Sequence, residues 1–188
     1  MDTGFRRKSD RGGVRIIAGK YGSRIIKAPR TYITHPMGDR IKSALFNTLG
    51  DIRGIEVWDA FAGSGALAIE SVSRGAAHAV ATERDPKSYR TLKENVERLG
   101  ATEVDAVKAN ARSWSSTNVD KLFDIIFCDP PYNDLQLSTV SALVSHMKPK
   151  GLMVLSYPGR EPTPVIDRVV VVDNRNYGDA ALASYRLL

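Results

Sequence analysis

From residue 55 onward, short apolar segments alternate with longer segments in which apolar residues recur at helical spacing. The apolar segments, each predicted to be a strand, are residues 55–60, 79–82, 104–108, 123–128 and 152–156. The segments predicted to be helices are residues 66–74, 86–99 and 135–147. This strand–helix–strand alternation predicts an α/β, Rossmann-like domain with a doubly wound and mostly parallel sheet.

Both ends of the chain depart from this alternation. A valine run at 169–172 is followed by a turn at 174–178 and an apolar segment at 181–188, and no helix separates the two segments. Strands joined by so short a connection pair antiparallel, which predicts a C-terminal hairpin. Near the N-terminus, residues 14–28 predict a small β-hairpin and residues 36–50 predict a helix.

The positive charge of the chain is concentrated in its first quarter. Residues 1–42 contain eleven Lys and Arg against three Asp, a net charge of +8, whereas the whole chain carries +6. A near-neutral body with a basic arm favours a polyanionic partner such as nucleic acid, with a solubilising tail as the alternative. The basic residues expected to contact nucleic acid are Arg6, Arg7, Lys8, Arg11, Arg15, Lys20, Arg24, Lys27 and Arg40. Residues 1–13 are predicted to be a basic, flexible tail.

Composition argues against several classes of protein. No apolar run approaches the ~20 residues needed to cross a bilayer, and the N-terminus lacks the apolar core of a signal peptide. Cys128 is the only cysteine, which excludes an internal disulfide, and three scattered histidines make a Cys/His metal cluster unexpected. We therefore expect a cytoplasmic protein that binds no metal and no membrane, and a monomer, since nothing requires a larger assembly.

The tetrad Asp129-Pro130-Pro131-Tyr132 directly follows a predicted strand. Each proline fixes φ and lacks an N–H group, and Pro131 holds Pro130 extended, so this backbone is stiff. The Asp129 carboxylate and the Pro130 carbonyl form a pair of acceptors suited to an exocyclic –NH2 group, and Tyr132 can stack on a planar ring. The tetrad indicates a site that holds an amino group on a base or amide, with an ordinary turn as the alternative.

A glycine-rich loop follows the first strand of the α/β block. Its sequence, Asp59-Ala60-Phe61-Ala62-Gly63-Ser64-Gly65, allows a tight turn and close approach of a ligand to the helix that follows. Glu83 ends the next strand eighteen residues after Gly65, where it can accept hydrogen bonds from a ribose diol. The candidate contacts to an adenine nucleoside cofactor are Asp59, Phe61, Ala62, Gly63, Gly65, Glu83, Arg84, Asn110, Ala111 and Asp129. The loop alone fits a nicotinamide cofactor and S-adenosylmethionine equally well.

Two features favour S-adenosylmethionine. Asp59 offers a carboxylate to the amino group of a methionine moiety, whereas it would repel a pyrophosphate. The fourth strand delivers the tetrad to the same carboxyl edge of the sheet, and hydride transfer has no evident use for such a group. Asn110, after the third strand, is placed to hydrogen-bond an adenine edge.

With these motifs the chain resembles the class I S-adenosylmethionine-dependent methyltransferases, and among them the bacterial small-subunit ribosomal RNA guanine-N2 methyltransferases of the RsmD type. The resemblance rests on residues 15–21, on 39–40 with 44–47, on 59–67 with Glu70 and 73–76, and on 123–132. It implies a seven-stranded sheet with an antiparallel C-terminal hairpin, S-adenosyl-L-methionine as cofactor, and 16S ribosomal RNA in the small ribosomal subunit as partner. Residues 51–188 would then form the methyltransferase domain, with residues 14–50 on the side of the RNA and the cofactor.

One segment departs from the family pattern. His35-Pro36-Met37 stands where the family usually has Arg-Pro-Thr, and Ser43 replaces an acidic residue common before Ala-Leu-Phe. Because this segment lies near the cofactor and target entrance in the family, the departures concern cofactor closure and target choice more than the fold.

The reaction implied by the resemblance is methylation of the exocyclic N2 amine of a guanine in 16S ribosomal RNA. The catalytic residues would be Asp129, Pro130, Pro131 and Tyr132. Acceptance of the two amine hydrogens by Asp129 and the Pro130 carbonyl would enrich the nitrogen in electrons, and Tyr132 would stack on the extruded base. An adenine-N6 or other amino methyltransferase acting on DNA or another RNA would use the same tetrad. A non-catalytic RNA-binding assembly factor would retain only the fold.

Overall fold

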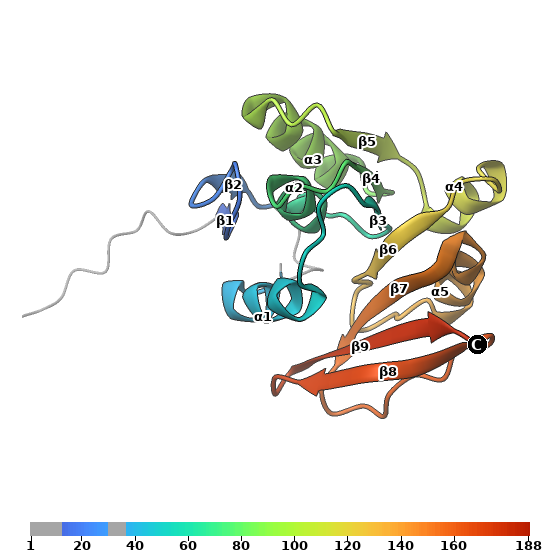
Figure 1. Ribbon diagram of the computed structural model, residues 1–188. Helices are drawn as coiled ribbons and strands as arrows, with labels where there is room; N and C mark the ends of the chain where they lie inside the picture. The colour runs from blue at the N-terminus through green and yellow to red at the C-terminus, as the bar shows by residue number, and fades with distance from the viewer. Residues whose placement is uncertain (1–12, 30–36) are drawn as a thin grey trace, which may run out of the picture.

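The computed structural model describes residues 13–29 and 37–188 of the chain. Within these residues, seven strands form one sheet and two short strands form a separate hairpin (Figure 1). The elements are β1 (Gly13–Arg15), β2 (Ile25–Lys27), α1 (Asp39–Leu49), β3 (Glu56–Asp59), α2 (Ala66–Ser73), β4 (His78–Glu83), α3 (Pro86–Leu99), β5 (Val104–Lys108), α4 (Ala111–Thr117), β6 (Phe123–Cys128), α5 (Leu137–Leu143), the 3₁₀ turn η1 (Val144–His146), β7 (Met147–Pro158), β8 (Val169–Asn176) and β9 (Ala180–Leu187). None of the helices in the described part of the chain has the length and apolar character to cross a bilayer.

The strand order of the sheet is β5-β4-β3-β6-β7-β9-β8. Strands β3 to β7 pair in parallel, and β9 pairs antiparallel with both β7 and β8. The predicted mostly parallel sheet with an antiparallel C-terminal hairpin is therefore confirmed. From the central strand β3, the chain adds β4 and β5 on one side and then crosses to the other side of β3, where it adds β6 and β7. In open α/β sheets, ligands bind at the carboxyl ends of the strands where the order reverses, here between β3 and β6.

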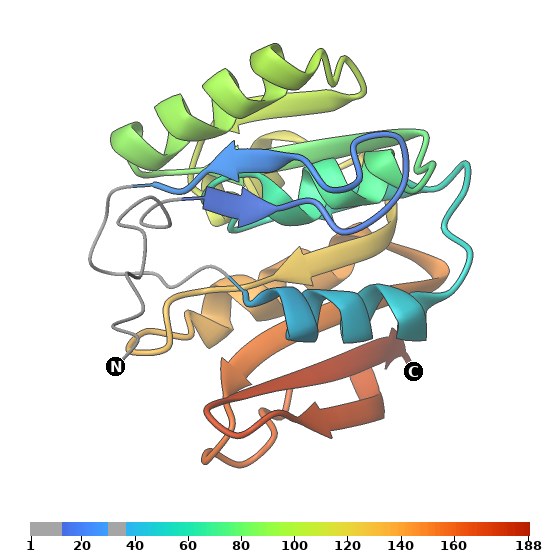
Figure 2. The same cartoon turned by 90° about the vertical axis from the view of Figure 1, so that its left-hand side faces the viewer.

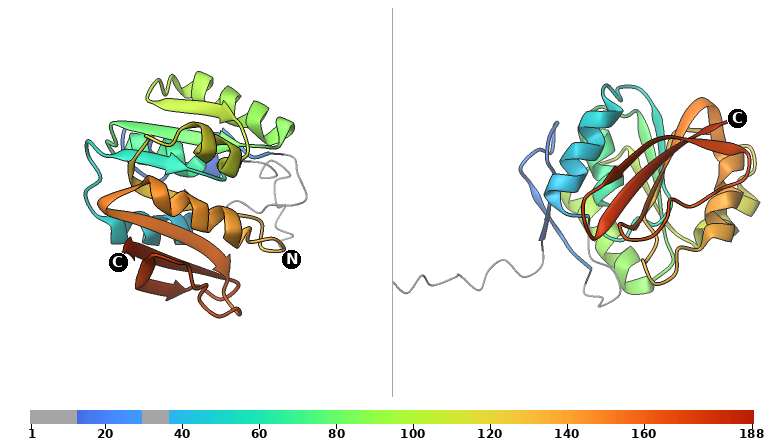
Figure 3. Two further views of the ribbon diagram at one scale, coloured as in Figure 1. Left: turned by 90° about the vertical axis from the view of Figure 1, so that its right-hand side faces the viewer. Right: turned by 90° about the horizontal axis from the view of Figure 1, so that it is seen from below.

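Helices cover both faces of the sheet (Figures 2 and 3). On one face, α1, α2 and α3 pack against strand residues such as Val57 and Phe127. On the other, α4 and α5 pack against Trp58 and Ile126, which neighbour those residues along the strands. Successive residues of a strand point to opposite faces of the sheet, and helices cover both faces. Residues of both orientations are therefore buried in the central strands, which form continuous apolar runs. This is why they could be located from sequence.

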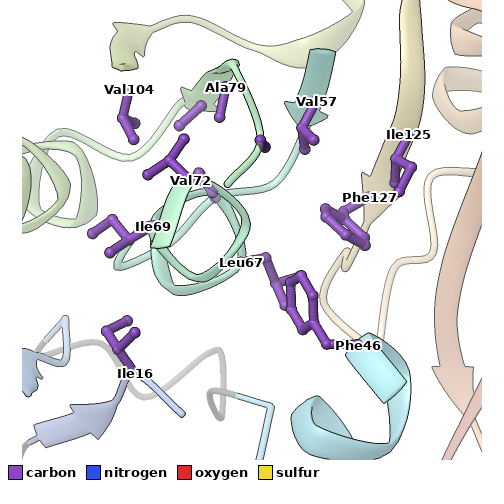
Figure 4. Packing of buried hydrophobic residues seen from close by; sticks show 14 of the residues in the cluster. Ile16, Phe46, Val57, Leu67, Ile69, Val72, Ala79, Val104, Ile125 and Phe127 are labelled. Carbon is purple, nitrogen blue, oxygen red and sulfur yellow. The ribbon is translucent and has the colours of Figure 1, made fainter. Parts of the chain in front are cut away.

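Helix α2 lies between the sheet and the N-terminal hairpin. Figure 4 shows Val72 on the side of Ala79 and Val104 of the sheet, and Leu67 beside Phe46 of α1. Ile16 of the hairpin belongs to the same buried cluster. Seven of the eight residues of α2 are buried. The hairpin and α1 therefore belong to the same core as the α/β domain.

Buried polar groups at the end of α2 hold the hairpin loop. Glu70 accepts hydrogen bonds from the backbone N–H groups of Ile17 (2.6 Å) and Ala18 (3.1 Å), and Ser73 Oγ accepts one from Tyr21 N (2.9 Å). Gly19 has a φ of 82°, and a Cβ at this position would lie 1.7 Å from the Ser73 carbonyl oxygen. Since these bonds occupy the loop backbone, β1 and β2 are only three residues long, shorter than predicted.

Helix α4 was absent from our predictions. It has seven residues, and four of the last five are Ser or Thr, which favour turns because their side chains compete for backbone hydrogen bonds. The Asn110 side chain starts the helix by accepting a hydrogen bond from Arg112 N at 2.9 Å. A short helix of this composition is maintained by the packing of Trp114 against Trp58 rather than by intrinsic propensity.

Several predicted boundaries were wrong. The helix expected at 135–147 begins at Leu137, and its last turn is the 3₁₀ turn η1. Strand β7 is much longer than the predicted 152–156, and β8 extends through most of the predicted turn, so that the turn covers only 177–179. Gly13, assigned to the tail, pairs with Lys27 in β1. The helix predicted from residue 36 begins at Asp39, after the extended Gly38. Residues 1–12 and 30–36 lie outside the described residues.

Candidate functional site

A cavity of about 300 Å³ opens at the carboxyl ends of β3, β4, β5 and β6, where the strand order reverses. The predicted site residues that line it are Asp59, Phe61, Ala62, Gly63, Glu83, Arg84, Asn110, Ala111, Asp129 and Pro131. Gly65, Pro130 and Tyr132 do not line it. Residues from four separate loops thus meet in one place, as expected for a cavity at this edge of the sheet.

The glycine-rich loop is held in place by Glu83. Its Oε2 accepts a hydrogen bond from Gly63 N at 2.9 Å, and its Oε1 accepts one from Asp85 N at 2.7 Å. Gly63 and Gly65 have φ values of 53° and 81°, in the left-handed region that disfavours other residues. A Cβ at Gly65 would also lie 2.4 Å from Leu92 Cδ1. Gly65 therefore packs the start of α2 against α3 instead of lining the cavity.

Asp59 presents an unsatisfied oxygen in the cavity wall. The residue is 1% exposed, and its Oδ2 accepts a hydrogen bond from Ala68 N at 3.2 Å. Its Oδ1 is buried and has no hydrogen-bond partner within the described residues. Burial, together with the charges of Asp129 and Glu83, raises the pKa of Asp59 to about 8. A ligand cation at Oδ1 would supply both the missing hydrogen bond and a compensating charge.

Lys42 of α1 lines the same cavity and was not among our candidates. Its side chain is fully buried, its Nζ donates a hydrogen bond to the Arg15 carbonyl, and it lies 4.0 Å from the Asp39 carboxylate. Burial lowers the pKa of Lys42, while Glu70 and Asp39 counteract that effect. A sequence signal existed: Lys42 lies within the stripe of α1 that includes Leu45 and Phe46, the side of the helix that faces the core.

Asp129 and Tyr132 share a neighbour on β7. Burial raises the pKa of Asp129 to about 6, and a hydrogen bond from the Ser156 hydroxyl acts in the opposite direction. The Tyr132 hydroxyl lies 2.8 Å from Ser156 Oγ, and the residue is 41% exposed. Ser156 therefore links the carboxylate to the aromatic residue of the tetrad, although no sequence signal identified it.

The remaining candidates differ in how they are used. Asn110 lines the cavity, and its Oδ1 caps α4. Pro130 is buried, and no hydrogen bond to its carbonyl oxygen occurs among the residues that the structure describes. That carbonyl keeps the free acceptor capacity that the tetrad predicted. No group of three or more His, Cys, Asp or Glu residues suited to a metal ion occurs in residues 13–29 and 37–188.

The basic residues of the hairpin and α1 fall into two groups. Lys20 pairs with Glu103, Lys27 with Glu94 (2.7 Å), and Arg15 with Asp39 (3.5 Å). By contrast, Arg24 and Arg40 are exposed and form no ion pair with any described residue. The candidates Arg6, Arg7, Lys8 and Arg11 lie outside the described residues.

Comparison with known proteins identifies the family. The family model described as Conserved hypothetical protein 95 matches residues 14–186. The chain belongs to this family. It is 35% identical over 134 residues to the ribosomal RNA small subunit methyltransferase D of Buchnera aphidicola subsp. Acyrthosiphon pisum, covering 71% of this chain and 69% of the relative. It is 31% identical to the protein of the same name from Haemophilus influenzae, with 94% of each chain covered.

A solved structure shares this fold. A hypothetical protein from Thermus thermophilus has a TM-score of 0.78 and 31% identity, covering 91% of this chain and 98% of the other. Since the family match begins at Val14, the hairpin and α1 are part of the family fold and not an addition to it. The fold expected from the resemblance, including the C-terminal antiparallel strands, is that of this family.

Proposed function

We propose that this protein transfers a methyl group from S-adenosyl-L-methionine to the exocyclic N2 amine of a guanine in 16S ribosomal RNA, within an assembled or assembling small ribosomal subunit. The observation that carries the proposal is one cavity that joins the glycine-rich loop to the Asp129 acceptor. Membership of the family and the names of its relatives support ribosomal RNA as the substrate.

The residues of the cavity fit the cofactor. S-adenosylmethionine supplies a methyl group already activated on a sulfonium, so no metal or covalent enzyme intermediate is required. Its methionine end carries one ammonium and one carboxylate. Asp59 Oδ1, buried without a partner among the described residues, would accept from the ammonium, and the buried Lys42 ammonium would pair with the carboxylate. Glu83 and Asn110 would contact the ribose and the adenine, while each also holds its own loop.

The target amine needs electron density, because its lone pair is delocalised into the guanine ring. Asp129 and the Pro130 carbonyl would accept its two hydrogens, which favours a pyramidal nitrogen with its lone pair aimed at the methyl group. The nitrogen–carbon bond would form as the carbon–sulfur bond breaks, with the thioether as leaving group, and one amine proton would then pass to solvent. Positioning and such preorganised acceptors can account for several kcal/mol of barrier. Tyr132, whose hydroxyl is held by Ser156, would stack on the base.

Nucleoside mass spectrometry tests the proposal. The protein is incubated with S-adenosylmethionine and small ribosomal subunits that lack the modification. We expect N2-methylguanosine at about one per particle. N6-methyladenosine would instead assign the protein to the adenine methyltransferases, and the absence of any methylated nucleoside would favour an assembly factor without catalytic activity.

The Asp129→Ala variant tests the role of the tetrad. We expect methyl transfer to fall by at least about 10²-fold, the usual scale for removal of one preorganised polar group, while cofactor affinity changes little. Calorimetric titration with S-adenosylmethionine provides the control. Equal loss of binding and turnover would mean that Asp129 is structural.

A further inference from the structure

Gln136 is a polar residue of the cavity that the reaction described above does not use. It follows the tetrad by four residues and lines the same cavity as Asp129 and Pro131. Its Nε2 is buried and has no hydrogen-bond partner among the described residues. A buried amide without a partner is unfavourable, so it calls for an explanation, and a ligand that completes its hydrogen bonds would supply one.

The backbone of Gln136 is also held in an unfavourable conformation. Its φ of 48° and ψ of 43° lie in the left-handed region, which residues other than glycine rarely adopt. Three hydrogen bonds maintain it: Gln136 N donates to Asp134 Oδ1 (3.3 Å), and Thr139 N and Val140 N donate to its carbonyl (2.8 and 3.0 Å). These bonds fix the backbone of Gln136 at the start of α5, and its side chain lines the cavity.

We propose that the Gln136 side-chain amide recognises the target guanine through the N1–H and O6 edge of its ring, beside the N2 amine. This inference rests on the proposed function. In guanine the N2 amine lies next to N1–H, a donor, and then O6, an acceptor. A side-chain amide offers an acceptor and a donor in one plane, so it can pair with both atoms. If adenine were bound with its N6 amine at Asp129, Gln136 would face the unprotonated N1, an acceptor, and then the C2 carbon. Only one of the two hydrogen bonds to the Gln136 amide could then form.

The proposal makes Gln136 a specificity-determining residue. Sites that hydrogen-bond a substrate group reject analogues that lack it, because the polar groups of the site are then left unpaired. Asp129 and the Pro130 carbonyl would accept from any amino group, and therefore cannot distinguish guanine from adenine. Gln136, which lines the same cavity, would add that distinction.

Two variants and a matched control test this role. Gln136→Leu removes the amide with little change in size, and Gln136→Gly also relieves the left-handed backbone. Asn133→Ala removes an exposed amide from the same loop. With small ribosomal subunits as substrate, we expect both Gln136 variants to lower kcat/KM by about 10- to 100-fold, while the dissociation constant for S-adenosylmethionine changes by less than about threefold. Asn133→Ala should match the wild type.

Thermal unfolding separates recognition from a structural role. Gln136→Gly should melt at the same or a higher temperature than the wild type, because glycine adopts the left-handed conformation readily, and yet it should be slow. Two results would overturn the inference: a loss of cofactor affinity parallel to the loss of turnover, or variants as active as the wild type. The proposed function would still hold in either case if the wild type forms N2-methylguanosine. A wild type that methylates adenine would overturn both.

Discussion

At the scale of single residues, the site places two carboxylates where burial opposes their ionisation. Asp59 and Asp129 end or follow the neighbouring strands β3 and β6, and burial raises their pKa values to about 8 and about 6. Each carboxylate is assigned a different hydrogen-bond donor, the cofactor ammonium for Asp59 and the base amine for Asp129. Groups with strongly perturbed pKa values in a cavity are typical of functional sites.

The ionisation of Asp129 predicts a pH profile. If the carboxylate form accepts the amine hydrogens, methyl transfer at saturating cofactor should rise about tenfold per pH unit below pH 6 and reach a plateau above it. Single-turnover rates between about pH 5 and 8 check this. A rate that is constant across that range would mean that the protonated form suffices.

Asp59→Asn should stabilise the protein in a pH-dependent way. The pKa of Asp59 is about 8 in the folded state against an ordinary value of 3.8, so between these values folding binds a proton and the wild type loses stability as pH rises. Asparagine removes that dependence. Each pKa unit corresponds to roughly 1.4 kcal/mol, and we expect a gain on the order of 2–4 kcal/mol at about pH 8 and almost none at about pH 4. Urea unfolding at both pH values measures this gain in the free energy of unfolding. An equal gain at both pH values would exclude the charge of the Asp59 carboxylate as the cause.

At the scale of elements, α2 joins the glycine-rich loop to the N-terminal hairpin. Its N-terminus follows Gly65, and its C-terminal half holds the hairpin loop through Glu70 and Ser73. Asn95 of α3 makes a second link, donating to Ser64 O of the glycine-rich loop (3.0 Å) and to Lys27 O of β2 (2.9 Å). Glu70 is a buried tether between α2 and the hairpin loop. The hairpin is therefore a fixed part of the cavity's surroundings.

Glu70→Ala should loosen the hairpin and destabilise the fold. It would leave two part-buried backbone donors and the Arg74 guanidinium, 2.7 Å from Glu70, without their acceptor. We expect a loss of about 3 kcal/mol in the free energy of unfolding. Amide hydrogen exchange at Ile17 and Ala18 should accelerate, while exchange in β8 and β9 serves as the internal control. Unchanged exchange at Ile17 would contradict the tether.

At the scale of the whole molecule, the described basic candidates for RNA contact lie on the hairpin and α1. Within the described residues, Arg24 and Arg40 are the RNA candidates without an ion pair, whereas Lys20 and Lys27 are paired with Glu103 and Glu94. Charges already paired within the protein release fewer counterions from RNA. The structure therefore indicates that Arg24 and Arg40 contribute more to RNA binding than Lys20 and Lys27, although composition alone did not separate them.

The salt dependence of RNA binding tests this ranking. Arg24→Ala and Arg40→Ala should each reduce the slope of log K against log salt concentration by about 0.7–0.9, the value for one phosphate contact. The matched changes Lys20→Ala and Lys27→Ala should alter it less. Filter binding to a 16S RNA fragment gives the slopes. Salt concentrations between about 50 and 200 mM suffice, because the affinity of proteins for nucleic acid usually changes strongly over this range. Equal slopes for all four variants would show that the protein's own ion pairs do not matter.

The features that sequence alone determined are those set by local pattern. The alternation of apolar runs and amphipathic helices predicted the sheet, the glycines predicted the loop conformation, and the two prolines predicted the stiff tetrad. Helix α4 and the extra length of β7 and β8 were missed, because Ser- and Thr-rich helices and polar strand ends depend on their neighbours for stability.

Tertiary structure decided the environment of each group. The burial of Lys42 against Arg15 and the link from Ser156 to Tyr132 join residues 27 and 24 positions apart in the chain, so no local pattern contains them. The raised pKa values of Asp59 and Asp129, and the unpaired amide of Gln136, likewise arise from the enclosure of these groups by other elements within the described part of the chain. Sequence identified many of the residues that line the cavity, but not Lys42 or Gln136. Only packing between distant segments determined their charge, their partners and their free hydrogen-bonding capacity, because desolvation and hydrogen bonding depend on what surrounds a group in space.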